Sequence, residues 1–206
     1  MTATLEPVHP LVAASGLSQR TVAVDLAARF SACVALDERG GLAEQWDSAG
    51  MGPREVAEAI RRTVDRNSLD GMPPLIVIED LPPHVPSSTV AKTVAQLQGR
   101  INQALTLAQL ERTFYVPPAY WERDMGVFRQ DEEVWTARAA SLGYTAPDLL
   151  AERGLVVGTR GQATAVKEAL KQQTDYVAAY LIAAWAQRSM AADRHWDLTV
   201  VKQYAA

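Results

Sequence analysis

The sequence predicts a single mixed α/β domain in which a three-stranded antiparallel meander precedes alternating helices and strands. Its 206 residues, 48% hydrophobic and 21% charged, have the size and composition of one soluble globular domain with its own core. Short apolar runs separated by tight turns open the ordered part of the chain, and two further apolar runs follow longer amphipathic segments. Together these observations predict one sheet flanked by helices.

The meander occupies residues 21–47. An apolar run at residues 22–24 is followed by runs at residues 31–36 and 42–47, with a polar, Gly-containing turn at residues 37–41 between the last two. Alternation with a period of two, bounded by glycine and charged residues, is typical of antiparallel strands joined by tight turns.

A helix and a buried strand come next. Pro53 suits the first position of a helix, and Val56, Ile60 and Val64 recur at helical spacing through residue 65. Residues 75–78 are continuously apolar, as in a strand buried on both faces, and this strand ends in Glu79 and Asp80.

A Pro-rich loop then leads to a long helix, predicted from the N-cap residues Ser87 and Ser88 to about Arg112. Its expected apolar face consists of Val90, Val94, Leu97, Ile101, Leu105 and Ala108. Gly99 in its interior makes this helix a candidate dimer surface, because glycine permits close approach of helices. Packing within the chain explains Gly99 equally well.

The last elements are a fifth strand at residues 113–116, short helices at about 119–125, 131–142 and 147–153, and a long helix at about 163–190. The apolar stripe of the long helix is expected to be Val166, Leu170, Val177, Leu181 and Trp185. We therefore expect a flexible N-terminal arm (1–19), one domain (20–190) with an elaborated helix and loop region (127–161), and a C-terminal extension (191–206).

Composition limits the functional classes. A net charge of −4 argues against a uniformly basic nucleic-acid binder but is compatible with a basic face beside an acidic centre. Cys33 is the single cysteine, so neither an intramolecular disulfide nor a cysteine-based zinc site is available. No apolar run approaches the roughly 20 residues of a membrane span, and the first residues lack a signal-peptide pattern. We expect a soluble cytoplasmic protein.

Carboxylates stand at three informative places. Asp25 lies in the otherwise apolar first strand, where a carboxylate is costly unless it is paired, hydrogen-bonded or metal-bound. Glu79 ends the fourth strand and Asp175 lies inside the last helix. The three would converge if the first and fourth strands are neighbours and the last helix packs across them. Asp80 alternates to the opposite face and is expected to face solvent or cap the loop.

Five segments together resemble the RuvC-type Holliday-junction resolvases of the RNase H-like superfamily: VAVDLAA, LIVIEDLPP, AKTVAQLQGRINQAL, FYVPPAYWERDMG and KEALKQQTDYVAAYLIAAWA. The match runs from about Thr21 to Gln187, except for residues 127–161. The resemblance implies an RNase H-like mixed five-stranded sheet flanked by helices. It also implies a metal-dependent, usually homodimeric endonuclease that cuts four-way or other branched DNA in a bacterial or phage-infected cytoplasm and uses no nucleotide cofactor.

Two-metal phosphodiester hydrolysis needs two Mg²⁺ ions about 3.5–4 Å apart, and such hard cations prefer carboxylate oxygens. The resemblance implies that Asp25 bridges two Mg²⁺ ions, with Mn²⁺ as the substitute, while Glu79 holds one ion and Asp175 the other. Family members commonly carry another Asp or His three residues before the final Asp, where this chain has Gln172. Gln172 ligates through its carbonyl oxygen, or Glu168 substitutes, or the second metal site is weak.

The candidate DNA contacts are cations in the segments near these acids, where they would neutralise phosphates: Lys92, Arg100, Arg112, Arg123, Lys167 and Lys171. The loop that follows Glu79, where the family places junction-contacting residues, offers His84 and Val85 but no aromatic side chain to wedge between bases. Tyr115, Tyr120 and Trp121 are expected to pack in the core and at strand ends.

Two rival functions remain open. An actin-like phosphotransferase would also begin with a strand, an Asp and a hairpin, but it needs a Gly-rich first turn and a second domain. A non-catalytic RNase H-like DNA-binding or assembly module would keep the fold without the chemistry, and Gln172 favours it. For a nuclease, the sequence leaves open whether the substrate is a Holliday junction, a flap, a replication fork or an RNA-containing hybrid.

Overall fold

The computed structural model describes residues 20–80 and 88–191. Its centre is a five-stranded sheet in the order β3-β2-β1-β4-β5. The antiparallel meander is formed by β1 (Thr21–Asp25), β2 (Ala32–Leu36) and β3 (Leu42–Asp47), while β4 (Leu75–Glu79) and β5 (Thr113–Val116) run parallel to β1. This is the mixed, RNase H-like sheet that the sequence predicts.

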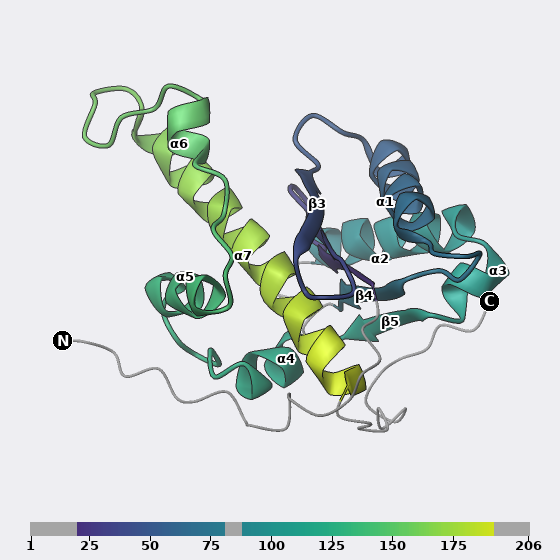
Figure 1. The fold of residues 1–206 in the computed structure, drawn as a ribbon. Helices are drawn as coiled ribbons and strands as arrows, with labels where there is room; N and C mark the ends of the chain where they lie inside the picture. Colours follow the sequence, from purple (N-terminus) through teal and green to yellow (C-terminus); the bar gives the residue numbers. More distant parts are fainter. Residues whose placement is uncertain (1–19, 81–87, 192–206) are drawn as a thin grey trace.

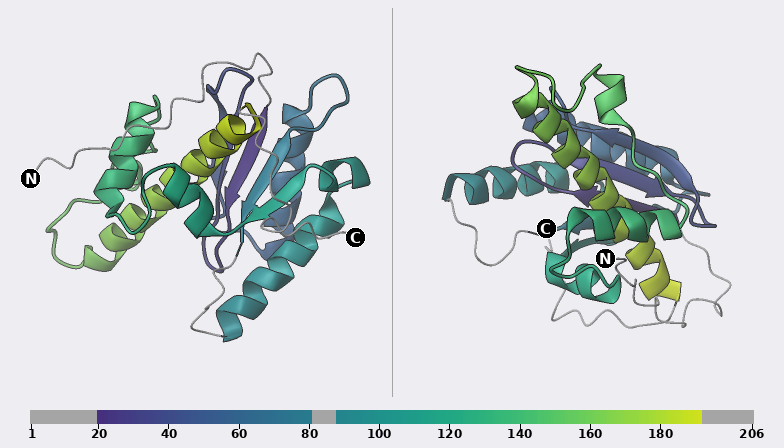
Figure 2. Two further views of the ribbon diagram at one scale, coloured as in Figure 1. Left: turned by 90° about the horizontal axis from the view of Figure 1, so that it is seen from below. Right: turned by 90° about the vertical axis from the view of Figure 1, so that its left-hand side faces the viewer.

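Helices cover both faces of this sheet (Figure 1; Figure 2). One face is covered by α1 (Pro53–Asn67) and α2 (Ser88–Ala104), and the other by α7 (Ala163–Ala191). Shorter helices complete the fold: α3 (Leu107–Leu110), α4 (Pro118–Asp124), α5 (Glu132–Ser141) and α6 (Leu149–Glu152). The helices α4, α5 and α6 all lie on the α7 side.

Strand alternation divides the interior into two cores. In β1, Val22 and Val24 pack with α1 and α2, whereas Ala23 packs with α7. Both faces of β1 are therefore fully buried, which explains why its sequence reads as a continuous apolar run.

The prediction of one helix running to Arg112 is wrong for the residues after Ala104. The helix α2 ends at Ala104, and Thr106 starts the separate helix α3 with a capping box, in which its hydroxyl accepts from the Gln109 backbone and Gln109 Oε1 accepts from Thr106 N at 2.9 Å. Val90 and Ala108, predicted for the apolar face, are exposed. A Cβ atom added to Gly99 would have no neighbour within 4 Å, so packing within the described chain does not explain this glycine.

The stripe predicted for α7 is wrong at one position and correct at the other four. Leu170 is 44% exposed, whereas Ala169 beside it is fully buried. This first part of α7 lies beyond the sheet and packs against the short helix α6. Less of its circumference is therefore buried than in the middle of the helix, which the sheet covers. Tyr120, expected to pack, is also exposed.

The predicted arm at residues 1–19, the loop residues His84 and Val85, and residues 192–206 of the predicted extension lie outside the described residues. None of the described helices combines the length and apolar character needed to cross a membrane.

Candidate active site

The site is built on the ends of two neighbouring strands. The parallel pairing of β1 and β4 aligns Val24 with Ile78, so the next residues, Asp25 and Glu79, lie side by side at the carboxyl ends of their strands. Asp25 and Glu79 stand two positions after Ala23 and Val77, which pack in the α7 core, and residues two apart on a strand share a face; both acids therefore face α7. Asp25 is the last residue of its strand and is only 8% exposed.

The side chains of Asp25 and Glu79 are hydrogen-bonded to each other. Burial, followed by the neighbouring Glu79 charge, holds the pKa of Asp25 well above its usual range. Burial also raises the pKa of Glu79 to about 7, although its hydrogen bonds with Asp25 and Trp121 lower it. Two buried acids this close repel each other when both are ionised, so the arrangement favours protonation of the pair. A cation between them would relieve the same repulsion.

Trp121 fixes one oxygen of Glu79. Its indole N–H, in α4, donates to Glu79 Oε1 at 3.0 Å, and the side chain is fully buried. The ring packs edge-on against Trp135 of α5 at 5.2 Å, and Trp135 in turn donates to the Val127 carbonyl at 3.0 Å. The elaborated region thus helps to hold the carboxylate of Glu79 in one orientation.

The third acid comes from α7. Burial and then the charge of Asp25 raise the pKa of Asp175 to about 7, and the charge of Asp175 also acts on Glu79. Lys171, one helical turn earlier, lowers the pKa of both Asp25 and Asp175. The structure therefore brings Asp25, Glu79, Asp175 and Lys171 into one interacting group.

Two further acids surround this group. Glu122 in α4 acts on Glu79, and Glu132 in α5 acts on Asp175; both raise the pKa of the acid they face. Burial raises the pKa of Glu122 itself. Because these acids outnumber Lys171, which acts on Asp25 and Asp175, the site repels a phosphate group unless cations enter it.

The donor set fits a hard divalent cation. Asp25, Glu79 and Asp175 supply carboxylate oxygens, and Gln172 Oε1 is buried and has no hydrogen-bond partner. This amide oxygen lies one turn before Asp175 and is of the chemical type that Mg²⁺ accepts as a ligand. Within residues 20–80 and 88–191, however, no three His, Cys, Asp or Glu side chains are grouped closely enough to hold a metal ion. Asp175 thus reaches the Asp25–Glu79 pair through charge, and only these two acids share a hydrogen bond.

The other predicted site residues lie further out. Glu168 and Lys167 are exposed on the outlying part of α7. Lys92 and Arg100 are exposed on α2, across the sheet from α7. Arg123 is exposed and stacks its guanidinium over the Phe128 ring at 4.6 Å.

Two residues differ from the sequence-based expectation. Asp80 was expected to face solvent or to cap the loop; it does not face solvent, because it is buried and accepts a hydrogen bond from Gln98 of α2 at 3.2 Å, while the loop at residues 81–87 lies outside the described residues. Arg112 comes directly before β5, and its carbonyl accepts a hydrogen bond from Ile76 N near the start of β4. It therefore lies at the end of the strands opposite to the acids. Alternation along β4 places Asp80 on the α2 face, where burial is as complete as on the other face.

Sequence reasoning missed Trp121 as a partner of Glu79, and it missed Glu122 and Glu132 as neighbours of the acids. The only signal for Trp121 was its place shortly after the fifth strand, which ends beside the fourth. Glu122 follows Trp121 directly. A helix at 131–142 was predicted, but the sequence gives no signal that it packs beside the acids, because residues 127–161 lack strong periodicity.

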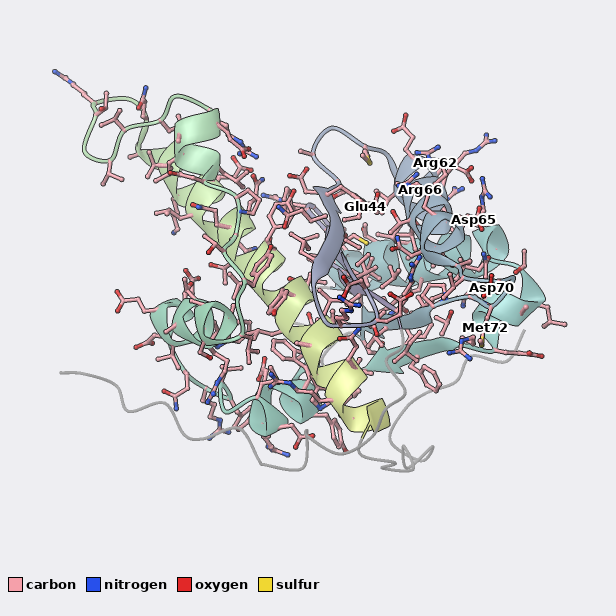
Figure 3. The ribbon with its side chains drawn as sticks, viewed as in Figure 1. Glu44, Arg62, Asp65, Arg66, Asp70 and Met72 are labelled. Carbon is pink, nitrogen blue, oxygen red and sulfur yellow. The ribbon has the colours of Figure 1, made fainter. Side chains whose placement is uncertain are left out.

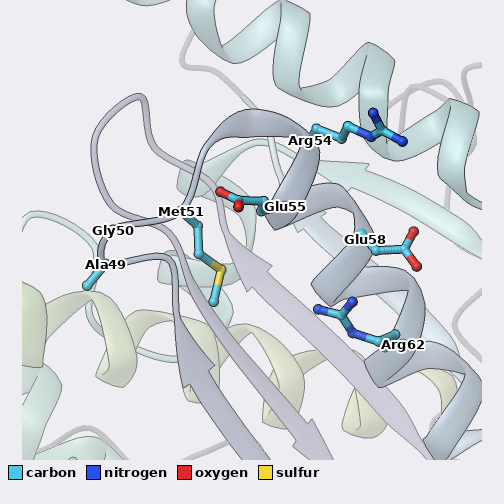
Figure 4. A pocket seen from close by; sticks show the side chains of 7 residues that line it. All are labelled: Ala49, Gly50, Met51, Arg54, Glu55, Glu58 and Arg62. Atoms are coloured by element: carbon cyan, nitrogen blue, oxygen red, sulfur yellow. The ribbon is translucent and has the colours of Figure 1, made fainter.

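A separate groove of about 590 Å³ lies where the chain passes from β3 to α1, lined by Ala49, Gly50, Met51, Arg54, Glu55, Glu58 and Arg62 (Figure 4). Its two arginines and two glutamates balance in charge. The neighbouring outer face of α1 is likewise paired, for example Arg66 with Glu44 (Figure 3). Because α1 covers the face of the sheet opposite α7, this groove is not part of the acid group.

No protein-family model matches the sequence, and no curated protein is similar enough in sequence to match it. Among solved structures, two of RuvC from Thermus thermophilus are similar, one of the protein and one of a complex with a Holliday junction substrate. Each has 13% identity and a TM-score of 0.48, covering 84% of this chain and 97% of that chain. A likeness this distant carries no weight in assigning the site, which rests on the topology and the residues described above.

Proposed function

We propose that this protein is a divalent-metal-dependent endonuclease that cuts branched DNA. The observation that carries the proposal is the buried, hydrogen-bonded pair Asp25 and Glu79 at adjacent strand ends, with Asp175 facing it from α7. Burying acids in this way destabilises a fold, and cation binding is the use that compensates for it. The motifs that resemble RuvC-type resolvases support DNA as the substrate.

In this proposal Asp25, Glu79 and Asp175, with Gln172 through its amide oxygen, would hold two Mg²⁺ ions. When bound, such ions activate a water molecule and stabilise the leaving oxygen of a phosphodiester. The residues of the chain prepare the site: Trp121 orients Glu79, and bound cations would offset the repulsion between Asp25 and Glu79 that raises the pKa of Asp25. Lys171, which interacts with both Asp25 and Asp175, is proposed to bind a non-bridging phosphate oxygen.

We propose a homodimer as the active form, because two symmetric sites would place paired cuts on a branched substrate. The exposed face of α2 that carries Gly99 supports this, since no described part of the chain packs on that glycine. Lys92 and Arg100 on the same helix, and Arg123 on α4, are proposed to contact DNA backbone.

The rival of a non-catalytic module has a specific observation in its favour. The acids are not closed into one cluster in the described structure, and Gln172 stands where a further acid would complete it. Such a module would bind branched DNA and cut nothing.

Cleavage of an end-labelled synthetic four-way junction in Mg²⁺ tests the proposal, with linear duplex as the comparison substrate. We expect symmetric nicks on the junction that Asp25→Asn abolishes. Asp70→Asn is the matched control: Asp70 is an exposed acid at φ 49° in a hairpin next to α1, a conformation that asparagine tolerates (Figure 3). Junction binding without cleavage in Mg²⁺ or Mn²⁺ would establish the non-catalytic module instead.

A further inference from the structure

The loop at residues 154–162 joins α6 to α7 at the end of α7 that projects beyond the sheet (Figure 1). Val156 and Val157 in this loop are 63% and 68% exposed. Two adjacent exposed valines at a protruding tip form a small apolar surface. Because they stay in water, these side chains contribute no hydrophobic stabilisation to the fold.

Hydrogen bonds give the loop a defined shape. Thr159 N donates to the Val156 carbonyl at 3.2 Å, Gln162 N donates to the Thr159 carbonyl at 3.1 Å, and Gln162 Oε1 accepts from Val156 N at 3.0 Å. Gly158 and Gly161 both have φ of 86°, which these two successive turns require. The exposure of the valines is therefore fixed by the local fold.

The charge around the valines is positive on balance. Residues 152–168 contain Arg153, Arg160 and Lys167, with Glu152 and Glu168 at the two ends, although the whole chain has a net charge of −4. None of these three cations forms a salt bridge with a described residue. A surface that combines apolar side chains with unpaired cations complements DNA better than it complements an average protein surface.

The position of the loop relative to the acids sets its reach. Along α7, Lys167 and Lys171 lie at successive turns between the loop and Asp175. Gln162 lies about 20 Å along the helix axis from Asp175, at 1.5 Å per residue. In duplex DNA this distance corresponds to about six base pairs.

We propose that residues 154–162 form an arm-binding tip, which rests on the proposed function and extends it. Val156 and Val157 pack against sugars and base edges in the minor groove of a DNA arm, about six base pairs from the phosphate at the acid group. Arg153, Arg160 and Lys167 bind the flanking phosphates. The tip thus selects substrates that carry a duplex arm of sufficient length.

The test measures binding of four-way junctions in Ca²⁺, which occupies carboxylate sites as Mg²⁺ does and is expected not to support cutting, with arms of about fifteen or about four base pairs. The double variant Val156→Ser and Val157→Ser is compared with wild type and with Leu107→Ser, a control on α3 that is also 68% exposed. We expect the double variant to bind long-armed junctions about tenfold more weakly and short-armed junctions as wild type does, since only the long arm reaches the tip. Leu107→Ser should match wild type on both.

Two further readouts separate the parts of the surface. The triple variant Arg153→Gln, Arg160→Gln and Lys167→Gln should lower the salt slope of long-arm binding by about 2 to 3, while the valine variant keeps it. Hydroxyl-radical footprinting should show protection about six base pairs from the cleavage position that the valine variant loses.

Equal affinity of wild type and the valine variant for long arms would overturn the inference, and so would a change in the solution mass of that variant, which would assign the tip to a protein contact. If wild type binds and cuts junctions in these cases, the proposed function stands without the tip. If wild type binds no DNA, both fail together.

Discussion

At the scale of single residues, the chemistry of this protein depends on how a buried carboxyl pair is satisfied. Asp25 and Glu79 share a hydrogen bond, Trp121 donates to Glu79, and Asp175 adds its charge from α7. A lone carboxylate at the end of a buried strand could be satisfied by backbone amides. Three interacting acids with raised pKa values, and a buried Gln172 oxygen without a partner, instead describe a site in which ionisation is unfavourable and which protons or cations would stabilise.

The first prediction concerns stability and pH without divalent ions. The pKa values of Glu79 and Asp175 rise to about 7 in the folded protein, from about 4 in the unfolded chain, so the folded state binds more protons between these values. The free energy of unfolding should therefore fall as the pH rises from about 4 to about 7, by at most about 4 kcal/mol for each of the two acids. Urea denaturation in EDTA across this range measures it.

In that experiment Asp25→Asn should flatten the dependence on pH and leave the protein more stable than wild type at pH 8, because one buried charge is gone. Addition of Mg²⁺ should raise the free energy of unfolding of the wild-type protein at pH 8 but not that of the variant. A wild-type stability that rises between pH 5 and 7 would show that the acids are not strained in the absence of cations.

The second prediction concerns Trp121. Trp121→Phe keeps a ring against Trp135 but removes the donor to Glu79 Oε1, and this hydrogen bond lowers the pKa of Glu79. We expect the Mg²⁺ concentration for half-maximal cleavage to rise about tenfold, as for other partners of metal ligands, and the pH profile to shift upward. Trp185→Phe is the control, since it loses a comparable indole bond, at 2.9 Å, to Asp124. If the two variants show the same dependence of cleavage on Mg²⁺ concentration and pH, Trp121 has no special role in orienting Glu79.

At the scale of elements, the strands could be predicted from sequence and the helices only in part. Alternation and turn residues identified the three strands of the meander, and short apolar runs bounded by prolines or charges identified β4 and β5. The break between α2 and α3 was missed: the apolar spacing continues across it, while the capping box at Thr106 ends the helix. Asp25, Glu79 and Asp175 were found because acids interrupt apolar patterns. Trp121 and Glu132 were not, because contacts between α4, α5 and the strand ends leave no periodic trace.

The third prediction separates the sequence pattern of α7 from its structure. Leu181 is fully buried and Leu170 is 44% exposed, although both were expected on one stripe. Leu181→Ala should cost about 2–5 kcal/mol of unfolding free energy, whereas Leu170→Ala should cost about 0.5 kcal/mol or less. Thermal and urea unfolding of the two variants measure this. Equal losses would mean that the first part of α7 packs as the middle does.

At the scale of the whole molecule, the sheet order β3-β2-β1-β4-β5 makes the acid group, because it places β1 and β4 side by side and parallel. One face of the sheet then serves stability, under α1 and α2, while α7 crosses the other face and brings Asp175 to the strand ends. The same helix projects beyond the sheet and carries the basic, apolar loop at residues 154–162. One long helix would thus connect catalysis with recognition of a DNA arm.

The central claim is that the acid group binds divalent cations, and direct counting of bound Mn²⁺ by electron paramagnetic resonance tests it most directly. We predict saturable binding of two ions per chain at pH 7.5, displaced by Mg²⁺, retained in Asp70→Asn and lost or reduced to one weak site in Asp25→Asn. Binding of no ion by a folded wild-type protein, or binding that Asp25→Asn leaves unchanged, would contradict the account.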